Sequence, residues 1–172
     1  VLDIFKFLKS RDSFIESSKR LMALRLLNPK FNKYTRETEI LSRLKAELGG
    51  QNIGELQFML TERGKQKDVQ TDWESSKWCK SSDGKSFVPQ TCRASAWAMP
   101  ENKLNMKEAP KQVKKWMQAF EEQYGAKYDS RQLMYRHDLS FAELEYKCGD
   151  RTYRTEMNAP QAAVLLMFTS ND

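Results

Sequence analysis

The sequence closes with the stretch Asn158-Ala-Pro-Gln-Ala-Ala-Val-Leu-Leu-Met-Phe-Thr-Ser-Asn-Asp172. It opens like a helix, with Pro160 in the first turn, where proline is tolerated, and it continues in an unbroken apolar run to Phe168. An apolar helix has to pack against other structure, and Val164, Leu165 and Phe168 are spaced for packing on a sheet. We therefore expect a buried terminal element, a domain cut out of a larger protein, or both.

The residues before this helix predict a small antiparallel sheet. Phe141–Lys147 and Thr152–Met157 flank the turn residues Gly149-Asp150, a favourable pair for a tight hairpin. Further strands are expected over Gln132–Arg136 and, in irregular form, over Phe87–Trp97. A helix that begins near Pro110 should separate these two strands, because proline suits the first helical position.

The first part of the chain predicts helices. The apolar spacing fits a helix that is capped at Asp12 or Ser13 and ends at Asn28-Pro29, since the residue before a proline disfavours helical backbone. A second helix is expected after an N-cap at Thr35. A third begins with the capping-box pattern Asn52-Ile-Gly-Glu55.

Helices followed by helices mixed with a small, mainly antiparallel sheet define the α+β class. We expect two parts, a helical bundle portion over residues 1–80 and an α/β subdomain over residues 81–172. The 172 residues are 40% hydrophobic and 30% charged, which suits a folded chain rather than a disordered one. No apolar run reaches the roughly 20 residues that cross a bilayer, so we expect no membrane segment.

The sequence lacks motifs for catalysis and for metal binding. It has no Gly-rich loop followed by Lys-Ser/Thr and no Gly-x-Ser-x-Gly elbow. His137 beside Asp138, and Cys79 beside Lys80, are more simply explained as a surface histidine and an ordinary loop thiol. The cysteines and the single histidine match no zinc spacing, and reduced thiols indicate a cytoplasmic or nuclear protein. We expect no enzymatic activity, no cofactor and no metal.

The net charge of +6 is unevenly distributed. Residues 1–85 carry 17 basic and 12 acidic side chains, whereas residues 86–172 carry 12 and 11. A basic half permits binding to nucleic acid or to an acidic protein tail, although a solvated helix surface explains it more simply. The sequence shows no recognition helix or aromatic platform, so a nucleic-acid-binding domain is the less favoured alternative.

Seven motifs, in order along nearly the whole chain, resemble the cullin family. Phe5-Lys-Phe-Leu-Lys-Ser-Arg-Asp-Ser-Phe14 and Leu21-Met-Ala-Leu-Arg-Leu-Leu27 are similar to the family's "kDvFe" start and "LAkRLL" helix. Leu41-Ser-Arg-Leu-Lys45 resembles "miskLK", and Leu56-Gln-Phe-Met59 resembles "LqrMf.D". Ser95-Ala-Trp97 resembles "sgsWP", and Arg131, Leu133 and Tyr135 follow "gRkL.W". Gln161-Ala-Ala-Val-Leu-Leu-Met-Phe168 resembles "Qa.vLLlFn". Each motif alone consists largely of core and cap residues, and their common order makes the resemblance specific.

The chain departs from the family pattern at individual positions. The lysine of the "kR" pair is Leu24, the Lys and Trp of "gRkL.W" are Gln132 and Tyr135, and no proline directly follows Trp97. These differences indicate a divergent cullin or, as an alternative, the cullin-like subunit of the anaphase-promoting complex.

The resemblance implies a non-catalytic scaffold of a cullin-RING E3 ubiquitin ligase. In the family, a C-terminal region holds a RING-H2 protein, which recruits the ubiquitin-conjugating enzyme, while N-terminal repeats hold substrate adaptors. The chain resembles the first part of that C-terminal region, namely the end of a four-helix bundle and the α/β subdomain. The adaptor-binding repeats and the lysine that accepts a ubiquitin-like modifier lie outside the resemblance.

The resemblance also implies a partner-binding surface. In the family, the N-terminal segment of the RING protein adds a strand to the cullin sheet, so that backbone hydrogen bonds bind it. We expect Trp97 to be an apolar anchor of this surface, with the alternative that Trp97, Leu133 and Tyr135 are simply core residues. The expected surface residues are Thr91, Arg93, Ser95, Trp97, Arg131, Leu133 and Tyr135.

A second expectation follows from the same family. Cullins offer a basic groove near the "kR" helix to the acidic tail of a conjugating enzyme. Lys19, Arg20 and Arg25 lie in the matching segment, although Lys19 and Arg25 are six residues apart and need not share a face. Salt should weaken such binding steeply.

Overall fold

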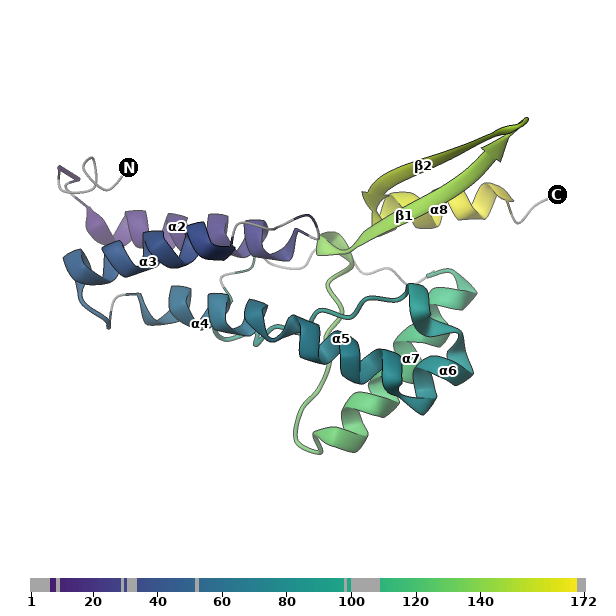
Figure 1. The fold of residues 1–172 in the computed structure, drawn as a ribbon, viewed down its shortest axis with the longest axis horizontal. Helices are drawn as coiled ribbons and strands as arrows, with labels where there is room; N and C mark the ends of the chain where they lie inside the picture. The colour runs from purple at the N-terminus through teal and green to yellow at the C-terminus, as the bar shows by residue number, and fades with distance from the viewer. Residues whose placement is uncertain are drawn as a thin grey trace. The chain divides into compact units, whose positions relative to one another are not determined.

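A computed structural model of the chain describes residues 7–8, 10–28, 30, 34–51, 53–97, 99 and 109–169. Helices together with an antiparallel pair of strands confirm the α+β class (Figure 1). The helices and strands are α2 (Arg11–Leu27), α3 (Tyr34–Leu48), α4 (Gly54–Gly64), α5 (Gln66–Ser75), α6 (Lys77–Ser82), α7 (Lys111–Lys127), β1 (Phe141–Cys148), β2 (Arg151–Asn158) and α8 (Ala159–Thr169).

By its internal contacts the chain divides into two compact units. The first contains residues 1–70 and 90–100, and the second contains residues 71–89 and 101–172. Compared with the expected parts 1–80 and 81–172, residues 71–80 join the second unit and residues 90–100 join the first.

The helices α2, α3 and α4 build the first unit, with α2 and α3 both packed on α4 (Figure 1). Their apolar faces meet in one core, and Trp97 from the non-helical segment joins it. Burial of one large apolar side chain stabilises a fold by about 1.5–3 kcal/mol, so this core holds the segment as well as the helices. The buried members are Met22, Ala23, Leu26, Leu41, Leu44, Ile53, Leu56, Met59, Leu60 and Trp97.

Two of the predicted helix caps are wrong by a few residues. Ser10 caps α2, because its side chain accepts a hydrogen bond from the Ser13 N–H, and Asp12 and Ser13 therefore lie inside the helix. Thr35 lies inside α3, which begins at Tyr34. In the first case a serine two positions upstream competes successfully for the same role.

The ends of α3 and the start of α4 follow local backbone rules. Gly49 follows α3 with φ of 78°, a left-handed conformation that suits glycine and ends the helix as predicted. The predicted capping residue Asn52 lies outside the described residues. The residue before α4 is Ile53, which makes no side-chain cap.

The second unit has an aromatic core around Trp73, which is fully buried at the end of α5. Its indole Nε1 donates a hydrogen bond of 3.0 Å to the Gly84 carbonyl. The rings of Phe87 and Phe120 contact it edge-on, with centroids at 5.7 and 5.6 Å. The ring therefore joins α5 to α7 and to the turn after α6.

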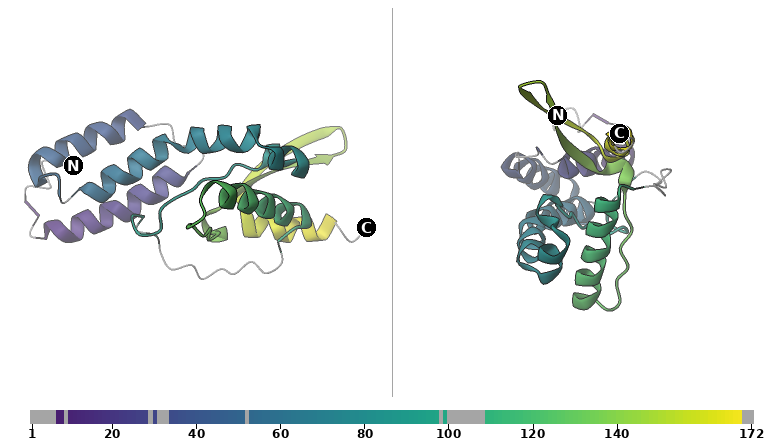
Figure 2. Two further views of the ribbon diagram at one scale, coloured as in Figure 1. Left: turned by 90° about the horizontal axis from the view of Figure 1, so that it is seen from below. Right: turned by 90° about the vertical axis from the view of Figure 1, so that its right-hand side faces the viewer.

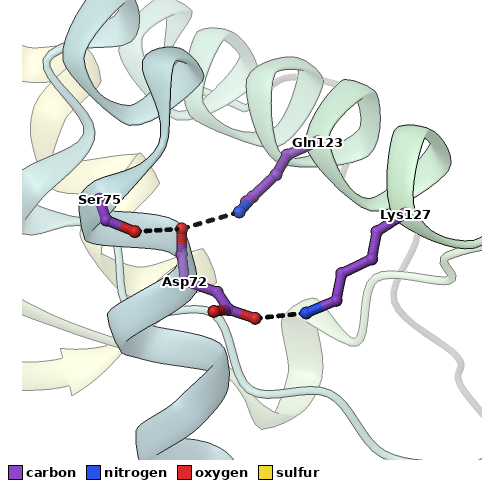
Figure 3. A network of polar contacts seen from close by, with 4 residues as sticks. All are labelled: Asp72, Ser75, Gln123 and Lys127. Carbon is purple, nitrogen blue, oxygen red and sulfur yellow. Dashed lines mark hydrogen bonds and ion pairs between the residues drawn. The ribbon is translucent and has the colours of Figure 1, made fainter.

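A polar network also ties α7 to α5 within the second unit (Figure 3). The Asp72 carbonyl accepts hydrogen bonds from Gln123 Nε2 at 3.0 Å and from Ser75 Oγ at 3.2 Å. The Asp72 carboxylate forms an ion pair with Lys127. α7 begins at Lys111, so Pro110 is its N-cap and not its first helical residue as predicted.

The predicted hairpin and last helix are confirmed. β1 and β2 pair antiparallel from Phe141↔Asn158 to Cys148↔Arg151, and Gly149 takes the positive φ, 60°, that the two-residue turn needs. α8 lies along this ribbon (Figures 1 and 2). It begins with an unpredicted capping box. Asn158 Oδ1 accepts from the Gln161 N–H at 2.9 Å, and Gln161 Oε1 accepts from the Asn158 N–H at 3.3 Å.

The prediction for the apolar face of α8 is wrong. Ala162 and Ala163 are the buried residues, whereas Val164, Leu165 and Phe168 are exposed, the last of them by 74%. Small side chains let the helix approach the ribbon closely, and the larger ones then point away from it.

The two further predicted strands are also absent from the described residues. In Phe87–Trp97 the N–H groups of Ala96 and Trp97 both turn back to the Arg93 carbonyl, and Gln132–Arg136 pairs with no other strand. In the first segment Thr91 and Arg93 bind side chains of α5 and α4, and in the second the Tyr135 hydroxyl donates to the Met117 carbonyl of α7.

The packing of Trp73 on Gly84 generates a prediction. A Cβ at Gly84 would lie 2.4 Å from Trp73 Cζ2, so Gly84→Ala should destabilise the chain by about 1–3 kcal/mol through overpacking. Gly125 in α7 has no atom within 4 Å of such a Cβ, so Gly125→Ala should instead stabilise by about 0.5–1 kcal/mol through helix propensity. Urea unfolding of both variants measures their free energies of unfolding. Equal stabilities would contradict the close packing of Trp73 on Gly84.

Candidate functional site

The first expected binding segment is held by α4 and α5. We call this segment, together with Gln90 before it, the tethered segment (residues 90–97). The Gln66 side-chain amide makes two hydrogen bonds to one residue of this segment: its Nε2 donates to the Thr91 carbonyl at 2.7 Å, and its Oε1 accepts from the Thr91 N–H at 3.0 Å. Gln66 is only 7% exposed. Its amide therefore occupies the place that the backbone of a neighbouring strand would take.

Glu62 holds the other end of the tethered segment. Its Oε2 accepts hydrogen bonds from the Trp97 indole Nε1 at 2.6 Å and from the Arg93 N–H at 3.2 Å. Hydrogen bonds to a carboxylate are stronger than those between neutral groups. The Arg93 guanidinium adds a contact of 4.7 Å to the centroid of the Phe58 ring. α4 thus fixes both the backbone and the side chain of Arg93.

These contacts use one edge of the tethered segment. In extended backbone, consecutive residues direct their N–H and C=O groups to opposite sides. Because the N–H and C=O of Thr91 and the N–H of Arg93 are directed toward the helices, Gln90 and Cys92 direct theirs away. Within the described part of the chain, the backbone groups of Gln90 and Cys92 have no hydrogen-bond partner. The segment therefore presents one satisfied edge and one open edge.

The side chains of the tethered segment differ in exposure. Trp97 is only 3% exposed and belongs to the core of the first unit, which favours the core alternative for its ring. Ser95 is exposed, and Thr91 is half-buried. Cys92 packs against the core, and burial, with a smaller contribution from the Glu62 charge, raises the pKa of its thiol to about 12. The thiol is therefore protonated at neutral pH.

The second expected binding segment belongs to the second unit, where α7 holds it. The Tyr135 hydroxyl donates to the Met117 carbonyl at 2.9 Å, and burial raises the pKa of that hydroxyl above its usual range. Leu133 is half-buried. The Arg131 guanidinium lies 4.3 Å from the centroid of the Tyr128 ring. The structure therefore places each predicted set within its own unit, the first set in the first unit and the second set in the second unit.

The expected basic patch is largely neutralised by acidic side chains. Lys19 forms ion pairs with Glu16 at 2.7 Å and Glu55 at 2.6 Å, and hydrogen bonds to these two carboxylates raise the pKa of its ammonium group. Arg25 forms two hydrogen bonds with Glu37, at 2.8 and 3.2 Å. Arg20 is exposed. The ion pairs of Lys19 with Glu55 and of Arg25 with Glu37 thus connect helices of the first unit.

The His137–Asp138 pair has the contacts of a structural element. Asp138 accepts two hydrogen bonds from the Arg136 guanidinium, at 2.9 and 2.7 Å, and these bonds hold the pKa of its carboxyl below the usual range. The His137 ring stacks on the Tyr135 ring, with centroids 6.1 Å apart. Burial lowers the pKa of His137, and the Asp138 charge opposes that shift.

The described residues contain no group of three or more His, Cys, Asp or Glu side chains that could hold a metal ion. In the same part of the chain, none of the helices combines the length and apolarity that crossing a bilayer requires.

Sequence reasoning missed the two residues on which the site depends. Glu62 and Gln66 are four positions apart, and they follow Met59 on the side of α4 and α5 that faces the core. A polar residue at a position where the helical period calls for an apolar one is the available signal, because a buried polar group needs a partner. The sequence does not identify that partner, which lies 25 to 35 positions away.

Two family models match the chain: the cullin alpha solenoid domain over residues 1–70 and the cullin alpha+beta domain over residues 91–172. The chain belongs to the cullin family. The tethered segment stands at the start of the cullin alpha+beta match, and Glu62 and Gln66 lie near the end of the alpha solenoid match.

Individual cullins align with the whole chain at low identity. It is 26% identical to Cullin-2 from Arabidopsis thaliana over 174 residues, which cover 100% of this chain and 23% of that relative. It is 23% identical to Cullin-1 from Schizosaccharomyces pombe, again over 100% of this chain and 23% of the relative. For Cullin-4A from Homo sapiens the identity is 25%, over 100% of this chain and 22% of the relative. The chain spans less than a quarter of the length of these cullins.

Acidification should destabilise the second unit in two separate pH windows. The pKa of His137 lies below its ordinary 6.5, so the unfolded chain binds a proton more readily, and stability falls as the pH drops below 6.5. The pKa of Asp138 lies below its ordinary 3.8, so stability from its pair with Arg136 is complete above pH 3.8 and is lost only as the pH falls through the lower native value.

Urea unfolding at a series of pH values measures both windows. His137→Gln should remove the dependence just below pH 6.5 and leave the acid window in place. A native chain that becomes more stable on mild acidification would contradict the sign of the His137 shift.

Proposed function

We propose that this chain is part of a non-catalytic scaffold of a cullin-RING E3 ubiquitin ligase. It binds a RING-H2 protein by strand addition and thereby positions the ubiquitin-conjugating enzyme that the RING protein recruits. The single observation that carries this proposal is the open edge of the tethered segment, formed by the backbone of Gln90 and Cys92. Membership in the cullin family supports the scaffold role in general.

An open edge favours an extended partner over a folded surface patch. Unpaired backbone groups form hydrogen bonds with any chain that approaches in extended form, so proteins seldom leave such an edge uncovered. Cys92, Ala96 and Met99 are partly buried against the core beside this edge. They would provide apolar contacts for alternate side chains of the added strand. The Trp97 ring is buried in the core of the first unit and anchors the segment there.

The segment from Arg131 to Tyr135 is a separate candidate for partner contact, within the second unit. It pairs with no other strand among the described residues, and Met134 is 80% exposed. An exposed methionine adapts readily to an apolar partner. The tethered segment nevertheless carries the proposal, because its open edge is defined by hydrogen bonds on the opposite side.

Co-expression with a RING-H2 protein tests the proposal. A stable 1:1 complex is expected on size exclusion with light scattering. A RING-H2 protein without its N-terminal segment should fail to form it, because that segment supplies the added strand. Retention of the complex by the truncated partner would contradict strand addition, and absence of a complex with the intact partner would contradict the proposed function.

Duplex DNA provides the control for the nucleic-acid alternative. The RING-H2 complex should persist in excess DNA and should depend weakly on salt, since backbone and apolar contacts are poorly screened. Binding to DNA would instead weaken steeply with salt. Displacement of the RING-H2 protein by DNA would favour the alternative class.

Binding of an acidic tail remains a subsidiary part of the proposal. The ion pairs of Lys19 with Glu16 and Glu55 compete with any acidic peptide for the same ammonium group. A tail would bind the exposed Arg20. It would bind Lys19 and Arg25 only where it replaces the glutamates that pair with them.

Removal of the competing acids tests this part. Glu55→Gln should strengthen the binding of an acidic peptide at low salt by about two- to fivefold, because one surface ion pair contributes under about 1 kcal/mol. Glu39→Gln is the matched control, since it changes the net charge equally on the exposed face of α3. Fluorescence anisotropy of a labelled peptide measures both, and equal effects would show that only net charge matters.

A further inference from the structure

We propose that Glu62 and Gln66 are positioning residues for the partner-binding edge. They fix the tethered segment from the helical side, so that the affinity for an added strand depends on two side chains that the partner does not touch. This inference rests on the proposed function and adds to it a residue-level cause for the affinity.

The geometry gives Gln66 a role at the Thr91 end. Its Nε2 donates to the Thr91 carbonyl at 2.7 Å and also lies 3.3 Å from the Glu62 carbonyl. One buried amide thus joins the α4–α5 junction to the segment. Among the described residues, Thr91 has no other hydrogen bond to its backbone N–H or carbonyl. Without Gln66, the backbone of this residue has no partner on the helical side.

Glu62 has the same role at the Trp97 end. One carboxylate oxygen accepts from both the Trp97 indole and the Arg93 N–H, so it fixes a side chain and the backbone four residues before it. The Trp97 ring is also held by apolar packing in the core. The Trp97 end is therefore held by a hydrogen bond and by packing of the same ring, whereas the backbone hydrogen bonds of Thr91 come from Gln66 alone among the described residues.

This asymmetry determines what each substitution does to partner binding. A strand that binds a preformed edge gains its hydrogen bonds without ordering the receiving backbone. A strand that binds a loose edge must also order the backbone of that edge. The conformational entropy lost by fixing one residue weakens binding by about tenfold. Loss of Gln66 should therefore weaken the RING-H2 complex even where the fold survives.

Gln66→Met is the direct test, because methionine has a similar volume and lacks both polar atoms. Gln123→Met is the matched control. Gln123 also donates from its amide to a backbone carbonyl, that of Asp72 at 3.0 Å, but it does so within the second unit (Figure 3). Affinity for a RING-H2 protein is measured by titration calorimetry, together with the thermal midpoint of each variant.

Gln66→Met should weaken binding by about tenfold or more, and Gln123→Met should change it by less than about twofold. Equal affinities for the two variants would overturn the inference, since binding would then not depend on how the segment is held. If Gln66→Met does not fold, two substitutions of Glu62 test the inference instead. Glu62→Gln keeps an acceptor oxygen and should bind nearly as well as the native chain, whereas Glu62→Leu should bind more weakly. Equal binding by these two variants would also overturn it.

Failure of the proposed function is distinguishable from failure of this inference. If the native chain binds no RING-H2 protein, the proposed function is rejected. The positioning role is then decided by NMR of the chain alone. Gln66→Met should shift or broaden the amide signals of Thr91 and Arg93, which Gln123→Met should leave in place. Unchanged signals in Gln66→Met would overturn the positioning role.

Discussion

The carboxylate of Glu62 is the contact on which the arrangement of the first unit depends. A single oxygen accepts from the Trp97 indole and from the Arg93 backbone, and so it brings a segment that follows α4 by about 30 residues back onto that helix. An indole N–H buried without an acceptor is costly, so the burial of Trp97 requires an acceptor of this kind. The core packing of Trp97 and the direction of the segment's open edge both follow from that one contact.

Buried polar residues connect elements within the described part of the chain, through their side chains or their backbone. They are Glu37, Gln66 and Ser82. Glu37 binds Arg25 between α3 and α2, Gln66 binds Thr91, and the Ser82 carbonyl accepts from Gln112 and Trp116 of α7. Because a buried polar group without a partner is costly, each of these residues fixes one relative placement of two elements. Gln66 differs from the other two in that its partner is an extended segment with a free opposite edge.

The sequence predicted those parts of the fold whose causes are local. The hairpin follows from Gly149 in its turn, and the ends of α2 and α3 follow from Asn28 and from Gly49. The strand expected around residues 87–97 failed because the backbone of Thr91 and Arg93 binds side chains of Gln66 and Glu62. The strand expected at 132–136 has no partner strand among the described residues, and the Tyr135 hydroxyl binds the distant helix α7. The sequence also does not show that Lys19 pairs with Glu55 and Arg25 with Glu37, because these acidic partners are on other helices.

The central claim is that the tethered segment has one edge closed by α4 and α5 and one edge open to a partner. Hydrogen exchange of the native chain, resolved by residue, tests it most directly. The account predicts slow exchange at the amides of Thr91 and Arg93 and fast exchange at those of Gln90 and Cys92, with Cys92 becoming slow when a RING-H2 protein is added. Fast exchange at all four amides, or slow exchange at Cys92 in the free chain, would contradict it.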